Sequence, residues 1–239
     1  MELPRLGGFA LTIGGVLLLV GFFFHPRPEE PGIDALARTI TDSVGGGVWY
    51  PLHVMLLFGV PIWMIGFLVV LYGVLADKGE RVYSLLAVFS LGLATIFAML
   101  GLVMEGFVEP ILAQRHLLAT EAGGSAAILL EYNTLLDRSI DSVTFFLLSL
   151  GPGLFGASLF RANLGRLALS GIVASVVGVA SYVAAVIGPY PYLIFTHTDI
   201  RYVWVFDLIS ALIIVWFLIV GALLFMGRIG PGRRNSSRT

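Results

Sequence analysis

The sequence predicts an all-α, polytopic membrane protein whose chain crosses the bilayer six times. Hydrophobic residues make up 58% of the 239 residues, charged residues make up only 12%, and the mean hydropathy is +0.95. A soluble domain carries about a quarter charged residues, so this composition excludes a soluble fold. A membrane β-barrel is excluded as well, because its strands would need a strict alternation of apolar and polar residues.

Six apolar stretches are long enough to span a membrane, since crossing about 30 Å of hydrocarbon takes about 20 helical residues. They are Leu6 to Phe24, Val48 to Ala76, Val82 to Met104, Ser142 to Phe160, Leu167 to Ile187 and Leu208 to Gly227. Their glycine and alanine content favours closely packed helices. The first stretch is not followed by a small-residue cleavage site, so we expect a retained helix. Residues 1–230 then form one membrane domain, and residues 231–239 a disordered basic tail.

The basic residues predict the orientation, because loops rich in Lys and Arg stay in the cytoplasm. Nine of the 14 Lys and Arg residues fall at one set of helix ends, together with both termini. Of the 15 acidic residues, 12 fall on the other side. We therefore expect a plasma-membrane or inner-membrane protein with both termini in the cytoplasm. Three in-out-in hairpins follow, and each odd-numbered helix is expected to exit at a proline: Pro26, Pro110 and Pro189.

Two outer segments are predicted to be helical in addition to the spans. Ile33 to Val44 has the pattern of a short amphipathic helix, and Gly45 to Gly47 provides a flexible break after it. Ala126 to Asp141 has apolar residues at helical spacing and continues into the fourth span without a helix breaker. The third and fourth helices are therefore expected to extend past the bilayer as a long hairpin.

All four histidines, His25, His53, His116 and His197, lie on the predicted outer side. His25 ends the first helix and His53 lies about one turn into the second. Because consecutive helices are usually neighbours, we expect these two imidazoles to face each other. Such a pair can bind a haem axially or ligate a metal ion. The alternative is that the longer outer loops simply collect polar residues. Cysteine is absent, which excludes thiolate metal sites and covalently attached haem.

Carboxylates are the stronger indication of a site, since ionisable residues in membrane helices are costly to bury and are functional by default. The predicted set is Glu105, Glu109, Asp137, Asp141 and Asp207. The first two are spaced i, i+4 and share a helix face, as do the next two. With His53 they would lie in the outer third of the membrane. There they can hold a divalent cation, relay protons or bind a polar head group.

A structural role for the same carboxylates stays open. Glu109 can be solvated, and Asp137 and Asp141 can stabilise the start of a helix through its dipole. Arg138 or Arg115 can neutralise a carboxylate in an ion pair, which imitates a functional site. If the carboxylates do crowd together, they cannot all stay ionised without a counter-charge. A pocket of this kind is therefore expected to prefer a cation or a protonated ligand.

Three stretches resemble one family. They are RLGGF from Arg5, the run from His53 to Leu75 that ends GFLVVLYGVL, and Arg161 to Gly178, which contains NLGRLALSG. Together they resemble uncharacterised six-helix integral membrane proteins of bacteria, which are grouped under a domain of unknown function. The resemblance covers the helices and not the outer loops. It implies the six-helix topology and assigns no functional residue.

The function expected from these observations is binding or redox chemistry in an outward-facing His/carboxylate pocket that holds a metal ion, a haem or a lipid-like ligand. The alternatives are a small transporter or channel, or a structural subunit of a larger membrane complex. No catalytic motif was found, so enzymatic activity stays open. The lipid bilayer is an expected partner, nucleic acid is not, and a homo-oligomer stays open.

Overall fold

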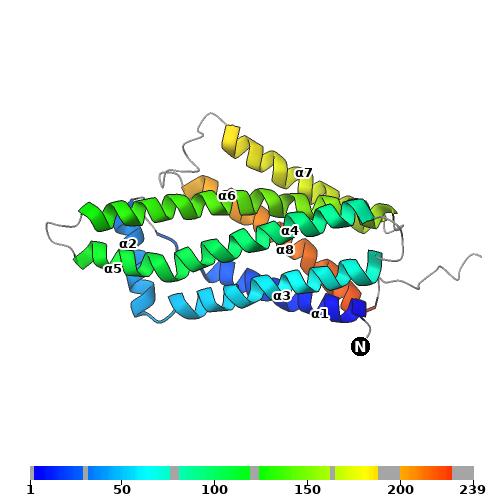
Figure 1. The fold of residues 1–239 in the computed structure, drawn as a ribbon, viewed down its shortest axis with the longest axis horizontal. Helices are drawn as coiled ribbons and strands as arrows, with labels where there is room; N and C mark the ends of the chain where they lie inside the picture. The colour runs from blue at the N-terminus through cyan, green and yellow to red at the C-terminus, as the bar shows by residue number, and fades with distance from the viewer. Residues whose placement is uncertain are drawn as a thin grey trace, which may run out of the picture.

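The computed structural model describes residues 3–28, 32–75, 81–118, 124–161, 165–187 and 200–227, and within them it is helical and contains no strand. In chain order the elements are α1 (Leu3–Phe24), α2 (Ile33–Gly45), α3 (Trp49–Leu75), α4 (Arg81–Val103), the π-helical turn η2 (Met104–Val108), α5 (Glu109–Leu118), α6 (Gly124–Arg161), α7 (Gly165–Ile187) and α8 (Ile200–Phe225). The predicted all-α class is confirmed for this part of the chain. Figure 1 shows an elongated bundle, with the start of α1 and the end of α8 at the same end.

Four helical stretches are long and apolar enough to cross a membrane: Arg5–Phe24, Trp49–Leu71, Val82–Leu118 and Gly124–Ser158. Two shorter apolar helices, Ala168–Val183 and Ser210–Phe225, accompany them. Large apolar side chains cover the outside of the bundle; Phe58, Phe89 and Val176 are each more than 60% exposed. Soluble monomers rarely present so large an apolar surface to water. These features are compatible with a multi-pass membrane protein.

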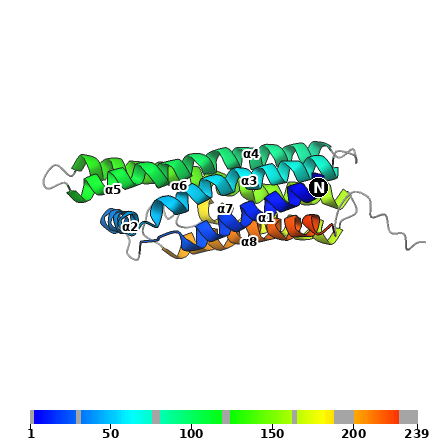
Figure 2. The ribbon, with the colours of Figure 1, turned by 90° about the horizontal axis from the view of Figure 1, so that it is seen from below.

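The helix α1 lies between α3 and α8, as the two views of the bundle show (Figures 1 and 2). Glycines allow α1 and α3 to approach each other backbone to backbone. A Cβ atom on Gly14 would overlap the backbone of Trp63, and one on Gly66 would overlap the backbone at Leu11. Such close contact maximises van der Waals packing between helices that gain nothing from hydrophobic burial in lipid.

The helix α4 packs on α6 and also contacts α3, so it joins the two parts of the bundle. The helix α7 packs mainly on α6, and α8 packs mainly on α1, so the last two helices are not a tightly packed pair. An apolar core fills the half of the bundle that is nearer to the start of α1 and the end of α8. Its largest members are Trp63, Phe67, Phe155, Trp216 and Phe217, whose rings make edge-to-face contacts.

At the opposite end, α5 and the first half of α6 form a helical extension, against which α2 packs (Figure 2). The helix predicted over Ile33 to Val44 is confirmed as α2, and the one predicted from Ala126 is confirmed as part of α6. A second apolar cluster joins these elements: Leu36, Ala37, Ile40, Trp49, Ala113 and Leu130. This cluster fixes α2 across the end of the bundle.

The prediction that the third helix exits at Pro110 is wrong. The helix continues through Pro110 to Leu118 after the π-helical turn η2. Proline has no N–H group, so the carbonyl of Gly106, four residues earlier, loses its helical donor. The indole Nε1 of Trp49 donates to that carbonyl instead, at 3.1 Å. At the turn itself, the N–H of Glu109 reaches back five residues to Met104. Pro26 does follow the end of α1, and Pro189 lies outside the described residues.

Candidate metal centre

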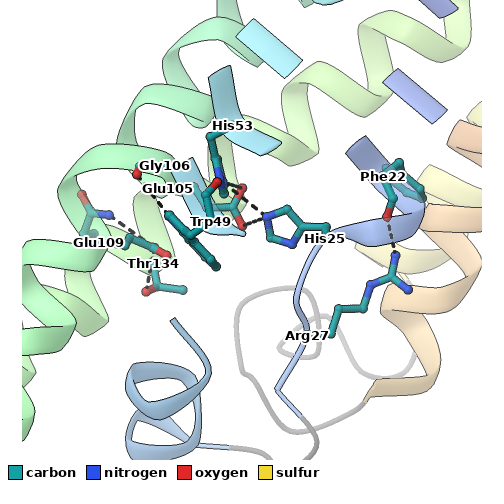
Figure 3. A network of polar contacts seen from close by, with 10 residues as sticks. Phe22, His25, Arg27, Trp49, His53, Glu105, Gly106, Glu109 and Thr134 are labelled. Carbon is teal, nitrogen blue, oxygen red and sulfur yellow. Dashed lines mark hydrogen bonds and ion pairs between the residues drawn. The ribbon is translucent and has the colours of Figure 1, made fainter. Parts of the chain in front are cut away.

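Three potential metal ligands converge where α1, α3 and η2 meet (Figure 3). The Nε2 atoms of His25 and His53 lie 3.3 Å apart. One carboxylate oxygen of Glu105 lies 3.3 Å from the Nε2 atom of His25, and the other lies 3.8 Å from that of His53. The three ligating atoms thus lie close enough together to surround one ion. Of the residues in the predicted set, the structure brings these three into direct contact.

The helix α3 fixes the orientation of His53. Its side chain is fully buried, and its Nδ1 atom lies 2.9 Å from the carbonyl oxygen of Trp49, one helical turn earlier. A carbonyl oxygen only accepts hydrogen bonds, so Nδ1 carries the proton and donates it. The lone pair of neutral His53 is therefore on Nε2, which faces His25 and Glu105. A hydrogen bond of this kind to the second ring nitrogen accompanies almost every metal-bound histidine.

His25 is held by the short segment that follows α1. Arg27 donates a hydrogen bond to the carbonyl of Phe22 at 3.4 Å, and its guanidinium lies 5.7 Å from the centre of the Phe22 ring. Figure 3 shows the side chain of Arg27 reaching back to the carbonyl of Phe22 at the end of the helix. The His25 ring lies 5.5 Å from the Trp49 indole, measured between ring centres. Its side chain is 19% exposed, so His25 is the more accessible imidazole of the pair.

Glu105 lies in the π-helical turn, and its neighbour Gly106 brings the turn close to α3. A Cβ atom at position 106 would lie 2.7 Å from the His53 ring, closer than real side chains approach. Glycine at 106 therefore lets the backbone of η2 pack directly on the imidazole. Short π-helical turns inside longer helices occur frequently at functional sites.

The spacing of the three ligands fits a tetrahedral ion. Two nitrogens that are each about 2.0–2.1 Å from a tetrahedral zinc lie about 3.3–3.4 Å apart. The observed 3.3 Å between the imidazole nitrogens matches this separation. Two imidazoles and one carboxylate form the ligand set of many catalytic zinc sites, and of some iron sites, and leave a coordination position open.

A cavity of about 380 Å³ adjoins the three ligands. His25 and Glu105 line its wall, as do Asp137, Arg138 and Asp141 from α6. Asp137 is 4% exposed, and its Oδ1 atom has no hydrogen-bond partner in the described part of the chain. The structure therefore brings Glu105, Asp137 and Asp141 to one cavity, while Asp137 and Asp141 are not in the group of three ligands.

Glu109 does not join the site. It is 2% exposed, and one of its carboxylate oxygens accepts hydrogen bonds from Asn133 at 3.3 Å and Thr134 at 3.1 Å. These bonds join α5 to α6. The alternative that Glu109 is solvated is therefore wrong, because its side chain is buried between the two helices. His116 lies elsewhere and contacts Asp34 of α2 at 2.6 Å. The side chain of Asp207 and the whole of His197 lie outside the described residues.

Two further residues build the site and were not among the predicted ones, Trp49 and Gly106. Trp49 orients His53 through its carbonyl and supports the π-helical turn through its indole. A signal was present in the spacing, because Trp49 lies four residues before His53 and Gly106 lies four residues before Pro110. The pairing of these two motifs requires the contact between α3 and η2, which the sequence does not show.

No family model matches the chain, and no curated protein or solved structure shows significant similarity to it. The resemblance to uncharacterised six-helix bacterial membrane proteins thus stays a prediction. The interpretation of the site depends on the chemistry and geometry of its own residues.

Proposed function

We propose that this chain is a six-span membrane protein that binds a divalent transition metal through His25, His53 and Glu105 on the outer side of the bilayer. The observation that carries the proposal is the convergence of the three ligating atoms, with the two imidazole nitrogens 3.3 Å apart. Imidazole nitrogens favour zinc and related transition metals, whereas magnesium and calcium favour oxygen ligands alone.

The six-span topology is part of the proposal. It adds α7 and α8 to the four long apolar stretches, since both are apolar helices of the same bundle. In Figure 1 the start of α1 and the end of α8 lie together, far from α2 and α5. The excess of Lys and Arg near the termini favours that end as the cytoplasmic one. The metal centre then lies toward the outer surface.

The geometry favours a metal ion over a haem. The axial ligands of a haem lie on opposite sides of the iron, which would separate two nitrogens at metal-bond distance by about 4 Å. The observed separation of 3.3 Å is shorter, and Glu105 contacts both imidazoles. Two imidazoles and a carboxylate on one side of an ion account for all three contacts.

A binding role is favoured over transport. The polar residues of the site lie on one side of the apolar core that contains Trp63, Phe67, Phe155, Trp216 and Phe217. Ions and polar solutes that cross a membrane need polar or hydrated groups along their path, because burial without partners is costly. In the described residues, this aromatic core separates the metal centre from the end where α1 begins.

The site also has the features of a reactive metal centre. His25 and Glu105 line the cavity, so the open coordination position of an ion bound to them would face it. An ion held by these ligands could polarise an oxygen that binds at the open position, or lower the pKa of a water molecule bound there. Whether a reaction follows depends on the ligand that enters the cavity.

Elemental analysis of the purified full-length protein tests the metal centre. We expect about one zinc, or another first-row transition metal, per chain. His53→Gln and Glu105→Gln should each lower the metal content at least tenfold, while keeping the volume of the side chain. His116→Gln is the matched control, because it changes a histidine that pairs with Asp34 away from the site. Wild-type protein that binds no transition metal after reconstitution would exclude the proposed function.

The topology is tested separately with reporters fused to the C-terminus. A reporter that is active only in the cytoplasm should be active, and one that is active only outside should be silent. The reverse result would place the metal centre on the cytoplasmic side.

A further inference from the structure

We infer that the cavity beside the metal centre binds a single-chain amphiphile, whose hydroxyl-bearing head lies against Asp137 and whose chain extends between the helices. The contact of the head with the metal depends on the proposed function. The contacts with Asp137 and with the apolar wall do not depend on it.

The cavity is elongated along the helices. On α4 and η2 it is lined by Ala94, Ala98, Leu102 and Glu105, which lie on one helix face. At 1.5 Å per residue, these positions span about 16 Å along the helix axis. On α6 the lining likewise runs from Asp137 to Leu148. A volume of about 380 Å³ spread over this length gives a narrow slot, and it lies in the usual range for small-molecule sites.

One end of the slot is polar and the other is apolar. His25, Glu105, Asp137 and Arg138 lie at the polar end. The other end is lined mainly by apolar side chains, with the hydroxyl groups of Thr95, Thr144 and Ser210 among them; the apolar ones are Val60, Trp63, Ala94, Phe145, Leu148 and Ile214. A molecule that fits both ends needs a polar head and an extended apolar chain.

The surroundings of Asp137 indicate that the head of the ligand must carry a hydrogen-bond donor. Its side chain lines the slot, it is 4% exposed, and its Oδ1 atom has no hydrogen-bond partner in the part of the chain that the structure describes. On the α4 side, Gly101 presents no side chain to it; a Cβ atom there would lie 3.1 Å from Oδ1. Buried carboxylates need hydrogen-bond donors. Because Oδ1 is covered by the helices, a ligand in the slot would donate to the other carboxylate oxygen, Oδ2. A hydroxyl group provides the donor without adding a second negative charge.

The proposed ligand can reach the metal as well. Glu105 and Asp137 line the same polar end, and the open coordination position of an ion held by His25 and Glu105 would face it. A head with two neighbouring hydroxyls can donate to Asp137 with one and approach the ion with the other. Arg138, which also lines this end, can donate to the remaining oxygens of the head.

The test uses the full-length, zinc-loaded protein in nanodiscs of phosphatidylcholine, with a monoacylglycerol brominated in the middle of its chain as the probe. Bromine quenches tryptophan fluorescence on contact, and Trp63 lies in the apolar wall. We expect quenching that saturates at a low mole fraction of the probe. Trp63→Phe should remove the saturable component and leave only the gradual quenching of the other tryptophans by probe in the bilayer.

Two comparisons separate a specific site from general partitioning into lipid. The methyl ester of the same brominated chain lacks the hydroxyls and should bind at least tenfold more weakly. Asp137→Asn keeps the shape of the side chain and replaces one acceptor oxygen with a donor amide, so it should weaken monoacylglycerol binding about tenfold and leave ester binding unchanged. Ala98→Phe should block the slot, whereas Ile96→Phe, which changes an exposed residue of the same helix, should not.

The inference is overturned if the ester and the monoacylglycerol quench equally, or if Ala98→Phe leaves the saturable quenching intact. Zinc content is measured on the same samples, so this failure is separate from that of the proposed function. Bound zinc without saturable quenching refutes the amphiphile site alone. Saturable quenching without any bound metal refutes the metal centre and retains the amphiphile site.

Discussion

Trp49 donates the hydrogen bond that Pro110 cannot. The carbonyl of Gly106 would normally accept from the N–H of residue 110, and the indole Nε1 of Trp49 takes that place at 3.1 Å. The carbonyl of the same tryptophan accepts from Nδ1 of His53. One residue therefore stabilises the turn that carries Glu105 and also orients the imidazole that faces it, so the two potential ligands are coupled through Trp49.

Trp49→Phe is expected to lower stability and metal content together. Phenylalanine keeps an aromatic ring in the apolar cluster but leaves the Gly106 carbonyl buried without a donor, which costs about 1–3 kcal/mol. Thermal unfolding in detergent and elemental analysis measure the two effects. Trp216→Phe is the matched control, since it removes an indole bond to Ser170 away from the site and should leave metal content unchanged. Equal metal loss in both variants would show that the coupling is not local.

Much of the helical architecture could be predicted from the sequence because it depends on local patterns. Apolar stretches of sufficient length mark the long helices, and the amphipathic pattern of Ile33 to Val44 marks α2. The contact of His25 with His53 also followed, because consecutive membrane spans are usually neighbours, although α2 lies in the connection between these two.

The sequence alone could not show that Glu105, and not Glu109, faces the two histidines. The i, i+4 spacing places both on one face of a regular helix, but η2 is a π-helical turn that changes this relation. The turn depends on Pro110 and on Trp49, which belongs to another helix. Tertiary contact therefore decides which carboxylate faces the histidines. The proline exit at Pro110 was wrong for the same reason.

Gly106→Ala should disturb the site through the side chain of His53. The added methyl group would lie 2.7 Å from the imidazole, so either the ring or the turn must shift. Overpacking of this kind costs about 1–3 kcal/mol, and the metal content should fall with stability. Gly92→Ala in α4 is the control, since its nearest contact would be a methionine methyl group at 3.8 Å. That variant should be neutral or slightly more stable because alanine favours helix. An unchanged metal content in Gly106→Ala would contradict the close packing of η2 on His53.

Acidification should release the metal. Histidine binds metal only when its ring nitrogen is unprotonated, so protons compete with the ion at His25 and His53. Metal retention should therefore decline as the pH falls from about 7 to about 5. The stabilisation that the metal provides is present at the higher pH and is lost at the lower one. Thermal unfolding with and without a chelator, at both pH values, measures the difference. A chelator effect that is equally large at pH 5 would contradict histidine ligation.

The role of Glu109 is distinguished by two substitutions at the same position. Glu109→Gln keeps an oxygen that can accept from Asn133 and Thr134, so stability and metal content should stay close to those of the unchanged protein. Glu109→Leu removes the acceptor and leaves the buried amide of Asn133 without this partner, which should cost about 1–3 kcal/mol. Because these bonds join α5 to α6 and do not touch the three ligands, metal content in the folded fraction should still be retained. Loss of metal in Glu109→Gln, with unchanged stability, would instead make Glu109 a ligand and would require a different arrangement of the turn η2.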